Sequence, residues 1–251
     1  MFLDLVYPPG LYCISCGKIT DSSRTYGLCN DCMKAVNWIT ERHCSKCGRP
    51  LAETDRGPLC FGCTATERSV QPHAFDKGHA CAGYGAAEQA LIFAFKYGAQ
   101  SHIGDILGEI MYDRMTAEYD PVELRQTYDM VVPIPIHREK KKRRGFNQAE
   151  LMARPFSKLS GIRCESELLI RTKATKAMKE LNREERRLNI DGAFELRERK
   201  KKSIQNASLL LVDDILTTGA TLNEAAAILK AAGASRVDFL VFAGGADIIL
   251  T

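Results

Sequence analysis

The chain has 251 residues, enough for one large domain or two smaller ones. Its hydrophobic content of 45% and charged content of 26% are ordinary for a soluble globular protein, and no apolar stretch reaches the roughly 18 residues that span a membrane. Residues 1–10 carry an acid within their apolar run and no basic region, so we expect no secretory signal and a cytoplasmic protein.

The net charge of +4 is small, but it is distributed unevenly along the chain. Residues 137–202 contain 21 Lys and Arg against 10 Asp and Glu, a local charge of +11, so the rest of the chain carries −7. A basic middle between acidic flanks predicts an anionic ligand that binds locally.

Eight of the ten cysteines form four CxxC pairs near the N-terminus, and the pairs repeat at an interval of 31 residues. Gly17 and Gly48 follow the first and third pairs and would let the chain turn back, so that amide groups face the sulfurs. The repeat predicts a duplicated unit in which four thiolates hold one structural zinc ion. The expected ligands of the two zinc ions are Cys13, Cys16, Cys29, Cys32, Cys44, Cys47, Cys60 and Cys63.

Iron–sulfur clusters, redox thiol pairs and disulfides would use the same cysteines, but a reducing compartment and the repeated spacing favour zinc. Pairing within each repeat is one ligand arrangement, and interleaved ligation is the other. The polar segment that follows contains His73 and His79, which we expect on the surface. Cys81 and Cys164 have no CxxC partner, and we interpret them as small core or surface residues.

The next segments alternate helical and strand patterns. Residues 85–115 predict helix, with a break around residues 98–104 and a solvated Lys96 before the break. Residues 128–135 predict a buried strand that prolines end. The charge run at residues 137–147 then predicts a ligand loop, and residues 147–159 predict a helix.

The stretch LLLVDDILTTGAT, Leu209–Thr221, combines three features that bind a sugar phosphate. Its apolar start predicts a strand buried on both faces, which places Asp213 and Asp214 at the carboxyl end, where open α/β sheets bind ligands. The Thr/Gly loop leads into a helix, and its amides suit a phosphate, while the acids suit ribose hydroxyls. An ordinary strand–turn–helix with two solvated acids is the alternative. Residues 236–243 predict a last buried strand.

This stretch resembles the 5-phosphoribosyl-1-pyrophosphate (PRPP) motif of type I phosphoribosyltransferases. The preceding sequence PIPIHREKKKRRGFNQAEL, which begins at Pro133, resembles the signature of the ComF family, as do residues 181–194 and Lys96–Tyr97. The chain departs from the family pattern at Met178, where members often carry glutamine.

The resemblance implies an α/β fold in which a type I phosphoribosyltransferase-like parallel sheet, flanked by helices, follows a small zinc-ribbon domain. We predict a double zinc ribbon over residues 1–68, a connection over 69–85 and the phosphoribosyltransferase-like domain over 86–251. The resemblance also implies that PRPP binds with Mg²⁺. Its ribose and 5′-phosphate would contact Asp213, Asp214, Thr217, Thr218, Gly219, Ala220 and Thr221.

The same resemblance implies a pyrophosphate loop over residues 136–146 and a flexible hood over 171–189. Transfer from PRPP needs positioning and electrostatic stabilisation of the leaving group rather than a covalent nucleophile. The catalytic candidates are therefore Arg144, Arg183 and Arg186. The residues expected to face pyrophosphate are His137, Arg138, Lys140, Arg143 and Arg144.

Three functions are consistent with these patterns. The first is a PRPP-dependent transferase with an unknown acceptor. The second is a non-catalytic PRPP-binding protein that acts on single-stranded DNA, since ComF-like proteins are tied to natural transformation and DNA uptake and a basic middle suits a phosphate backbone. The third is an assembly module whose zinc ribbons bind a protein of the competence machinery.

Overall fold

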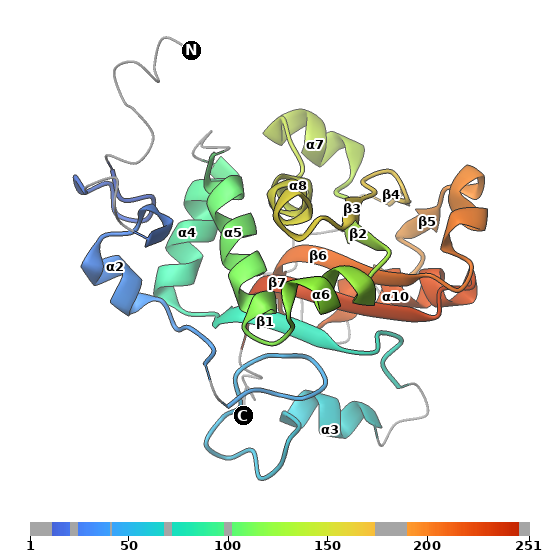
Figure 1. The fold of residues 1–251 in the computed structure, drawn as a ribbon, viewed down its shortest axis with the longest axis horizontal. Helices are drawn as coiled ribbons and strands as arrows, with labels where there is room; N and C mark the ends of the chain where they lie inside the picture. The colour runs from blue at the N-terminus through green and yellow to red at the C-terminus, as the bar shows by residue number, and fades with distance from the viewer. Residues whose placement is uncertain are drawn as a thin grey trace.

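The computed structural model of the protein describes residues 12–20, 25–40, 42–67, 72–97, 102–173 and 190–245. Its centre is a five-stranded parallel sheet with the order β1-β7-β6-β2-β3 (Figure 1). The long inner strands are rich in apolar residues, as expected of strands that are covered on both faces. This confirms the predicted α/β class with a parallel sheet. The strands are β1 (Gly78–Gly83), β2 (Met130–Pro133), β3 (Arg163–Cys164), β6 (Ser208–Leu216) and β7 (Arg236–Gly244).

Helices pack on both faces of the sheet, and alternate residues of β6 show which layer lies on which side. Leu210 and Val212 belong to the hydrophobic cluster that contains the buried residues of α4, α5 and α8, so we name this side the α5 face. Leu209 and Leu211 belong to the cluster that contains α10, which defines the α10 face. The helices are α4 (Ala86–Tyr97), α5 (His102–Thr116), α6 (Pro121–Thr127), α8 (Gln148–Ser160) and α10 (Ala220–Ala231).

The predicted helical stretch over residues 85–115 corresponds to α4 and α5, and the residues between them lie outside the described residues. Within the described ranges, no helix has the length and apolar character that crossing a membrane requires. The remaining elements are short: η1 (Thr25–Gly27), α2 (Asn30–Ala35), α3 (Phe61–Glu67), α7 (Arg138–Arg144), β4 (Leu169–Arg171), β5 (Phe194–Leu196) and η3 (Glu198–Ile204).

The two cysteine-rich units lie on opposite sides of the edge strand β1. Buried residues of the first unit join the cluster of the α5 face, and the four cysteines of the second join the cluster of the α10 face. In Figure 1, α2 of the first unit lies beside α4, and α3 of the second lies across β1 from it. The link between the units runs along β1, because Ile39 N donates to Cys81 O at 3.0 Å and Gly83 N donates to Asn37 O at 2.7 Å. This link covers the edge of the sheet.

Strand β1 lies inside the segment 69–85 that the sequence predicts as a connection, and it explains why one prediction was wrong. His79 was expected on the surface, but its side chain is 1% exposed. The imidazole Nδ1 lies 3.2 Å from Glu118 Oε2, and burial lowers the pKa of His79. The neighbouring Cys81 is also buried, and Cys164 on β3 is half-buried.

Helices α5 and α8 approach each other closely because two glycines of α5 face α8. A Cβ atom at Gly108 would lie 2.7 Å from the Met152 carbonyl oxygen and 2.4 Å from Pro155 Cγ. A Cβ atom at Gly104 would meet Leu151 at 2.8 Å. This contact fixes α8, which carries the residues after the basic segment, against the sheet.

Gly108→Ala should therefore destabilise the protein, although alanine is the better helix former by about 1 kcal/mol. Overpacking at this backbone contact costs about 1–3 kcal/mol, which outweighs the gain in helix propensity. Urea unfolding followed by circular dichroism measures the change in the free energy of unfolding. An unchanged or raised midpoint would show that the two helices are not in close contact.

Candidate functional site

Each cysteine-rich unit gathers its own four thiols, and within each unit the four Sγ atoms lie within 4.8 Å of one another. The Cys16–Cys29 and Cys47–Cys60 Sγ distances are both 3.7 Å. A zinc ion with four Zn–S bonds of ~2.3 Å places its sulfurs about 3.8 Å apart, whereas a disulfide needs about 2.0 Å. The thiols therefore fit two zinc sites, and the cysteines are grouped within each repeat rather than interleaved between the repeats.

The backbone of the two units repeats as the 31-residue interval predicts. Gly17 N donates to Cys13 O at 2.9 Å, and Gly48 N donates to Cys44 O at 2.8 Å. Both glycines have a φ of +72°, a conformation that glycine adopts without steric cost. An amide also faces a sulfur as expected, because Cys29 N donates to Cys13 Sγ at 3.3 Å.

The two clusters differ in burial. All four cysteines of the second cluster are buried, whereas Cys16 of the first is exposed and Cys29 and Cys32 are half-buried. The second cluster also shares the hydrophobic core of the α10 face with β6 and β7. The first site is therefore open to solvent, and the second is part of the core.

The acid pair lies in the last four residues of strand β6, which continues to Leu216. On one side, the pairing of β6 with β2 ends at Val212 opposite Pro133. On the other side, β7 pairs with β6 as far as Leu216 opposite Gly244. Asp213 and Asp214 therefore lie where β2 has ended and β6 continues, at the carboxyl edge of the sheet.

Alternation along β6 gives the two acids different neighbours. Asp214 lies in register with the α5 face, where Lys96 at the end of α4 forms an ion pair with it. Asp213 lies in register with the α10 face and interacts electrostatically with Arg171 at the end of β4. Lys96, which we expected to be solvated, has a side chain only 20% exposed. The family-like Lys-Tyr dipeptide was the one signal in the sequence for this contact.

Two aromatic rings join the end of α4, next to Lys96, to the segment after α7. Phe95, which precedes Lys96, is fully buried and stacks with Phe146 at a centroid distance of 6.1 Å. Phe146 lies in the RGFNQ motif at the join of α7 and α8. The motif and the end of α4 are thus packed together beside the acid pair.

Burial and the neighbouring Asp214 raise the pKa of Asp213 to about 7. The Asp214 amide limits this rise, because it donates to Asp213 Oδ1 at 2.9 Å. Charged Lys96 and Arg171 act in the same direction as the amide. The half-buried Asp213 carboxyl therefore lies close to its titration point at neutral pH.

The basic segment, predicted as a loop over residues 136–146, instead contains helix α7. His137 caps this helix, since its Nδ1 accepts from Glu139 N at 3.4 Å, and Gly145 ends it with a φ of +84°. Lys, Arg and Glu are good helix formers, so the charge run favours a helical turn once both caps are present.

Three cations of α7 lie near Lys96 and Arg171, and we call these five residues the cationic group. The members from α7 are Lys140, Arg143 and Arg144. Burial and the positive charges of Arg171, Arg144, Arg143 and Lys96 lower the pKa of Lys140, so these five side chains share one electrostatic neighbourhood. Arg138 is exposed at the start of the helix, and His137, only 8% exposed, serves as its cap. The members of the cationic group repel one another, and a bound anion would offset this repulsion.

Two amides after α7 hold this cationic group against the sheet. Asn147 Nδ2 donates to Ile134 O at 3.0 Å, next to the end of β2. Gln148 Oε1 accepts from Arg144 Nη1 at 3.0 Å. The RGFNQ motif, residues 144–148, thus has a structural role in addition to its charge, and the sequence did not reveal this role.

The Thr/Gly loop joins β6 to α10 as predicted. Gly219 has a φ of +80°, and its carbonyl accepts from Asn223 N at 2.8 Å in the first turn of α10. Within the described ranges, no protein hydrogen bond engages the N–H groups of Thr217, Thr218 or Gly219. Thr221 lies in the first turn of α10, after Ala220. The loop therefore offers amide donors beside the acid pair, an arrangement that suits a phosphate.

Two catalytic candidates, Arg183 and Arg186, lie outside the described residues, as does Met178. The described flanks of this segment, β4 and β5, pair antiparallel through Leu169–Leu196 and Arg171–Phe194. This pairing brings together the described residues on either side of the predicted hood. The Arg171 guanidinium lies 5.3 Å from the Phe194 ring centroid.

Comparisons with known protein families agree with this arrangement. A double zinc ribbon domain matches residues 2–64, and a phosphoribosyl transferase domain matches residues 129–247. The fold and site therefore define a protein with an N-terminal double zinc ribbon and a phosphoribosyltransferase domain.

Similar proteins have the same organisation along most of their length. The DNA utilization protein YhgH of Escherichia coli O6:H1 is 28% identical over 217 residues, which cover 84% of this chain and 88% of that protein. Competence protein F of Haemophilus influenzae is 28% identical, covering 84% and 87%, and competence protein ComFC of Bacillus subtilis is 26% identical, covering 82% and 79%. The chain therefore resembles the ComF/YhgH proteins over more than four fifths of its length.

The difference in burial between the clusters predicts two stages of zinc loss. A chelator should remove one zinc equivalent per chain from the folded protein, because the first cluster is open to solvent. The second equivalent should leave only with unfolding, and a zinc-sensitive dye followed together with circular dichroism measures both. Cys16→Ser should abolish the early stage alone; simultaneous loss of both ions in the folded wild type would contradict the assignment.

The raised pKa of Asp213 predicts a pH-dependent gain in stability for Asp213→Asn. The carboxyl ionises with a pKa of about 7 in the folded chain but with its ordinary value near 3.8 when unfolded. Stability of the wild type is therefore lost as pH rises from 4 to 7 and then levels off. In calorimetry, Asp213→Asn should melt a few degrees above the wild type at pH 8, with a smaller difference at pH 4. The exposed Asp105→Asn serves as the control, and an equal difference at both pH values would show that Asp213 titrates normally.

Proposed function

We propose that this protein binds PRPP with Mg²⁺ and transfers its phosphoribosyl group to an acceptor. The observation that carries this proposal is the position of the acid pair directly before a loop with available amide donors, opposite the cationic group of α7. A ligand that satisfies all three must combine hydroxyls, a terminal phosphate and a second, strongly anionic group. PRPP has these features.

The residues would divide the ligand between them. Asp213 and Asp214 would accept hydrogen bonds from the ribose 2′- and 3′-hydroxyls, and the amides of Thr217–Thr221 would hold the 5′-phosphate. Lys140, Arg143 and Arg144, with Arg171 beside them, would hold the pyrophosphate and stabilise its charge as the C1–O bond breaks. Mg²⁺ bound with PRPP would add a further cation that neutralises the leaving group. Arg183 and Arg186 remain catalytic candidates in the hood.

This function can be tested by following pyrophosphate release from PRPP and Mg²⁺ across a panel of acceptors. We expect release with one acceptor class and a loss of at least a hundredfold in Asp213→Asn/Asp214→Asn, since each lost hydrogen bond to a charged group weakens binding by about 1.5–3 kcal/mol. Asp105→Asn, an exposed acid on α5, should retain full activity. Tight PRPP binding without turnover for every acceptor would instead support a non-catalytic PRPP-binding protein.

We further propose that the protein acts in DNA uptake or utilization, with single-stranded DNA as a partner. The relatives named as DNA utilization and competence proteins support this role, and the local charge of +11 supports binding to a phosphate backbone. Lys141 and Lys142 are exposed on α7. They lie outside the set assigned to PRPP, so they can report on DNA separately.

Binding of a labelled oligonucleotide should weaken steeply with salt if this role holds. The log of the binding constant falls with the log of the salt concentration, and Lys141→Ala/Lys142→Ala should make this slope shallower by about 1.4. Each phosphate contact to a single strand contributes about 0.7 to the slope. PRPP binding should be unchanged. Lys34→Ala/Lys158→Ala removes two exposed lysines elsewhere and is the control. Salt-insensitive binding, or none, would reject the DNA partner.

A further inference from the structure

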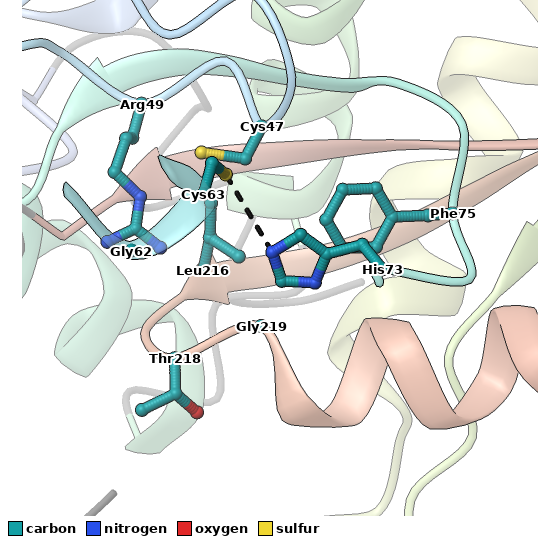
Figure 2. Close-up of a pocket in the computed structure, with 9 residues that line it drawn as sticks. All are labelled: Cys47, Arg49, Gly62, Cys63, His73, Phe75, Leu216, Thr218 and Gly219. Carbon is teal, nitrogen blue, oxygen red and sulfur yellow. Dashed lines mark hydrogen bonds between the residues drawn. The ribbon is translucent and has the colours of Figure 1, made fainter. Parts of the chain in front are cut away.

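The second zinc unit reaches the Thr/Gly loop through one arginine. Arg49 follows the turn at Gly48, is only 4% exposed, and its Nη2 donates to Thr217 O at 2.9 Å. Figure 2 shows the small pocket at this junction, with Arg49, Cys47 and Cys63 on the side of the zinc unit. Leu216, Thr218 and Gly219 line it from the side of the loop.

The backbone of Arg49 is fixed by the zinc-binding turn itself. Its carbonyl accepts from the amide of Cys44, a zinc ligand, at 2.8 Å. The same turn is fixed to β1, because Gly78 N donates to Lys46 O at 2.8 Å. A Cβ atom at Gly48 would lie 2.5 Å from Gly78 O, so the turn lies directly against the strand backbone. The position of Arg49 therefore depends on the second cluster and its seat on the sheet.

The other end of the contact controls the direction of an amide in the loop. A trans peptide unit is planar, so its C=O and N–H groups point to opposite sides. With the Thr217 carbonyl held toward Arg49, the Thr218 N–H points to the other side of the loop, away from the zinc unit. A charged donor makes a stronger bond than a neutral one, and the Arg49 end of this bond is buried.

The described part of the first zinc unit, residues 12–20 and 25–36, has no equivalent contact. It packs on the α5 face, and among the described residues no hydrogen bond joins residues 12–36 to residues 213–221. Its contacts include the bond from Tyr26 Oη to Asp113 on α5, at 2.6 Å. The two zinc sites thus differ in their relation to the loop as well as in their exposure.

We propose that Arg49 is a positioning residue for the Thr/Gly loop, and that the second zinc site, unlike the first, thereby controls the affinity for PRPP. The inference rests on the proposed function, since it assumes that the loop holds the 5′-phosphate. Arg49 donates to a carbonyl oxygen of the loop, so it acts through the backbone of Thr217 and Thr218 rather than on the ligand.

The test compares zinc-loaded Arg49→Gln with Arg42→Gln. Arg42 lies in the same zinc unit and also donates to a carbonyl, that of Asp55 at 2.7 Å, but this contact stays within the unit. Hydrogen exchange of the peptide that spans Thr217–Ala225, read by mass spectrometry without ligand, reports on the end of the loop, where the Asn223 amide donates to Gly219 O in the first turn of α10. Exchange should be about tenfold faster in Arg49→Gln and unchanged in Arg42→Gln. In calorimetric titration with Mg²⁺ and PRPP, Kd should rise about tenfold in Arg49→Gln alone.

PRPP binding by the wild type tests the proposed function, and exchange in the Arg49 variant tests the role of Arg49. If the wild type does not bind PRPP, the proposed function fails, and the exchange data still decide whether Arg49 positions the loop. Wild-type exchange and wild-type affinity in Arg49→Gln, with two zinc ions per chain, would overturn the inference.

Two further variants cover the case in which Arg49→Gln loses zinc. Arg49→Lys keeps the charge but lacks the planar guanidinium, and it should give an intermediate rise in exchange and in Kd. Cys16→Ser disrupts the first cluster alone and should leave both loop exchange and Kd unchanged. A tenfold loss of PRPP affinity in Cys16→Ser would contradict the distinction between the two sites.

Discussion

Four buried cysteines lie in the same hydrophobic cluster as the inner strands β6 and β7. Thiolates in such a place are stable only when a metal ion compensates their charge, so a zinc ion bound here would stabilise the packing of the α10 face. The sheet, helix α10 and the Thr/Gly loop between them are built on this face. The first cluster differs, because it is partly open to solvent and contacts the sheet from the α5 face. The second zinc unit is therefore part of the structure that carries the proposed PRPP site.

Like charges are crowded on both sides of the site, at a cost in stability. The raised pKa of Asp213 and the lowered pKa of Lys140 have the same two causes, burial and neighbours of the same sign. Ligand hydroxyls would satisfy the acids, and ligand phosphates would neutralise the cations. Such opposed shifts in adjacent groups are typical of binding and catalytic sites rather than of surfaces selected for stability.

The parts of the fold that follow from local patterns could be predicted from the sequence. Apolar runs gave the inner strands, and the 31-residue repeat of CxxC pairs gave the two zinc units. The contacts of Arg49 and His79 join segments far apart in the chain, so no local pattern reveals them. For the contact of Lys96, the family-like Lys-Tyr dipeptide was the one signal in the sequence. The helix over residues 138–144 was missed because a charge run is equally compatible with a loop, and its caps decide the outcome. The boundaries 1–68, 69–85 and 86–251 remain a prediction, with β1 inside the segment expected to connect the domains.

We propose that the end of β6 and the start of α10 form a ribose phosphate site whose pyrophosphate side is α7. A crystal structure of the zinc-loaded protein with PRPP and Mg²⁺ would locate the ligand. We expect ribose hydroxyls on Asp213 and Asp214, the 5′-phosphate on the amides of Thr217–Thr221, and pyrophosphate beside Lys140 and Arg144. Ligand density elsewhere, or a 5′-phosphate bound away from this loop, would contradict this proposal.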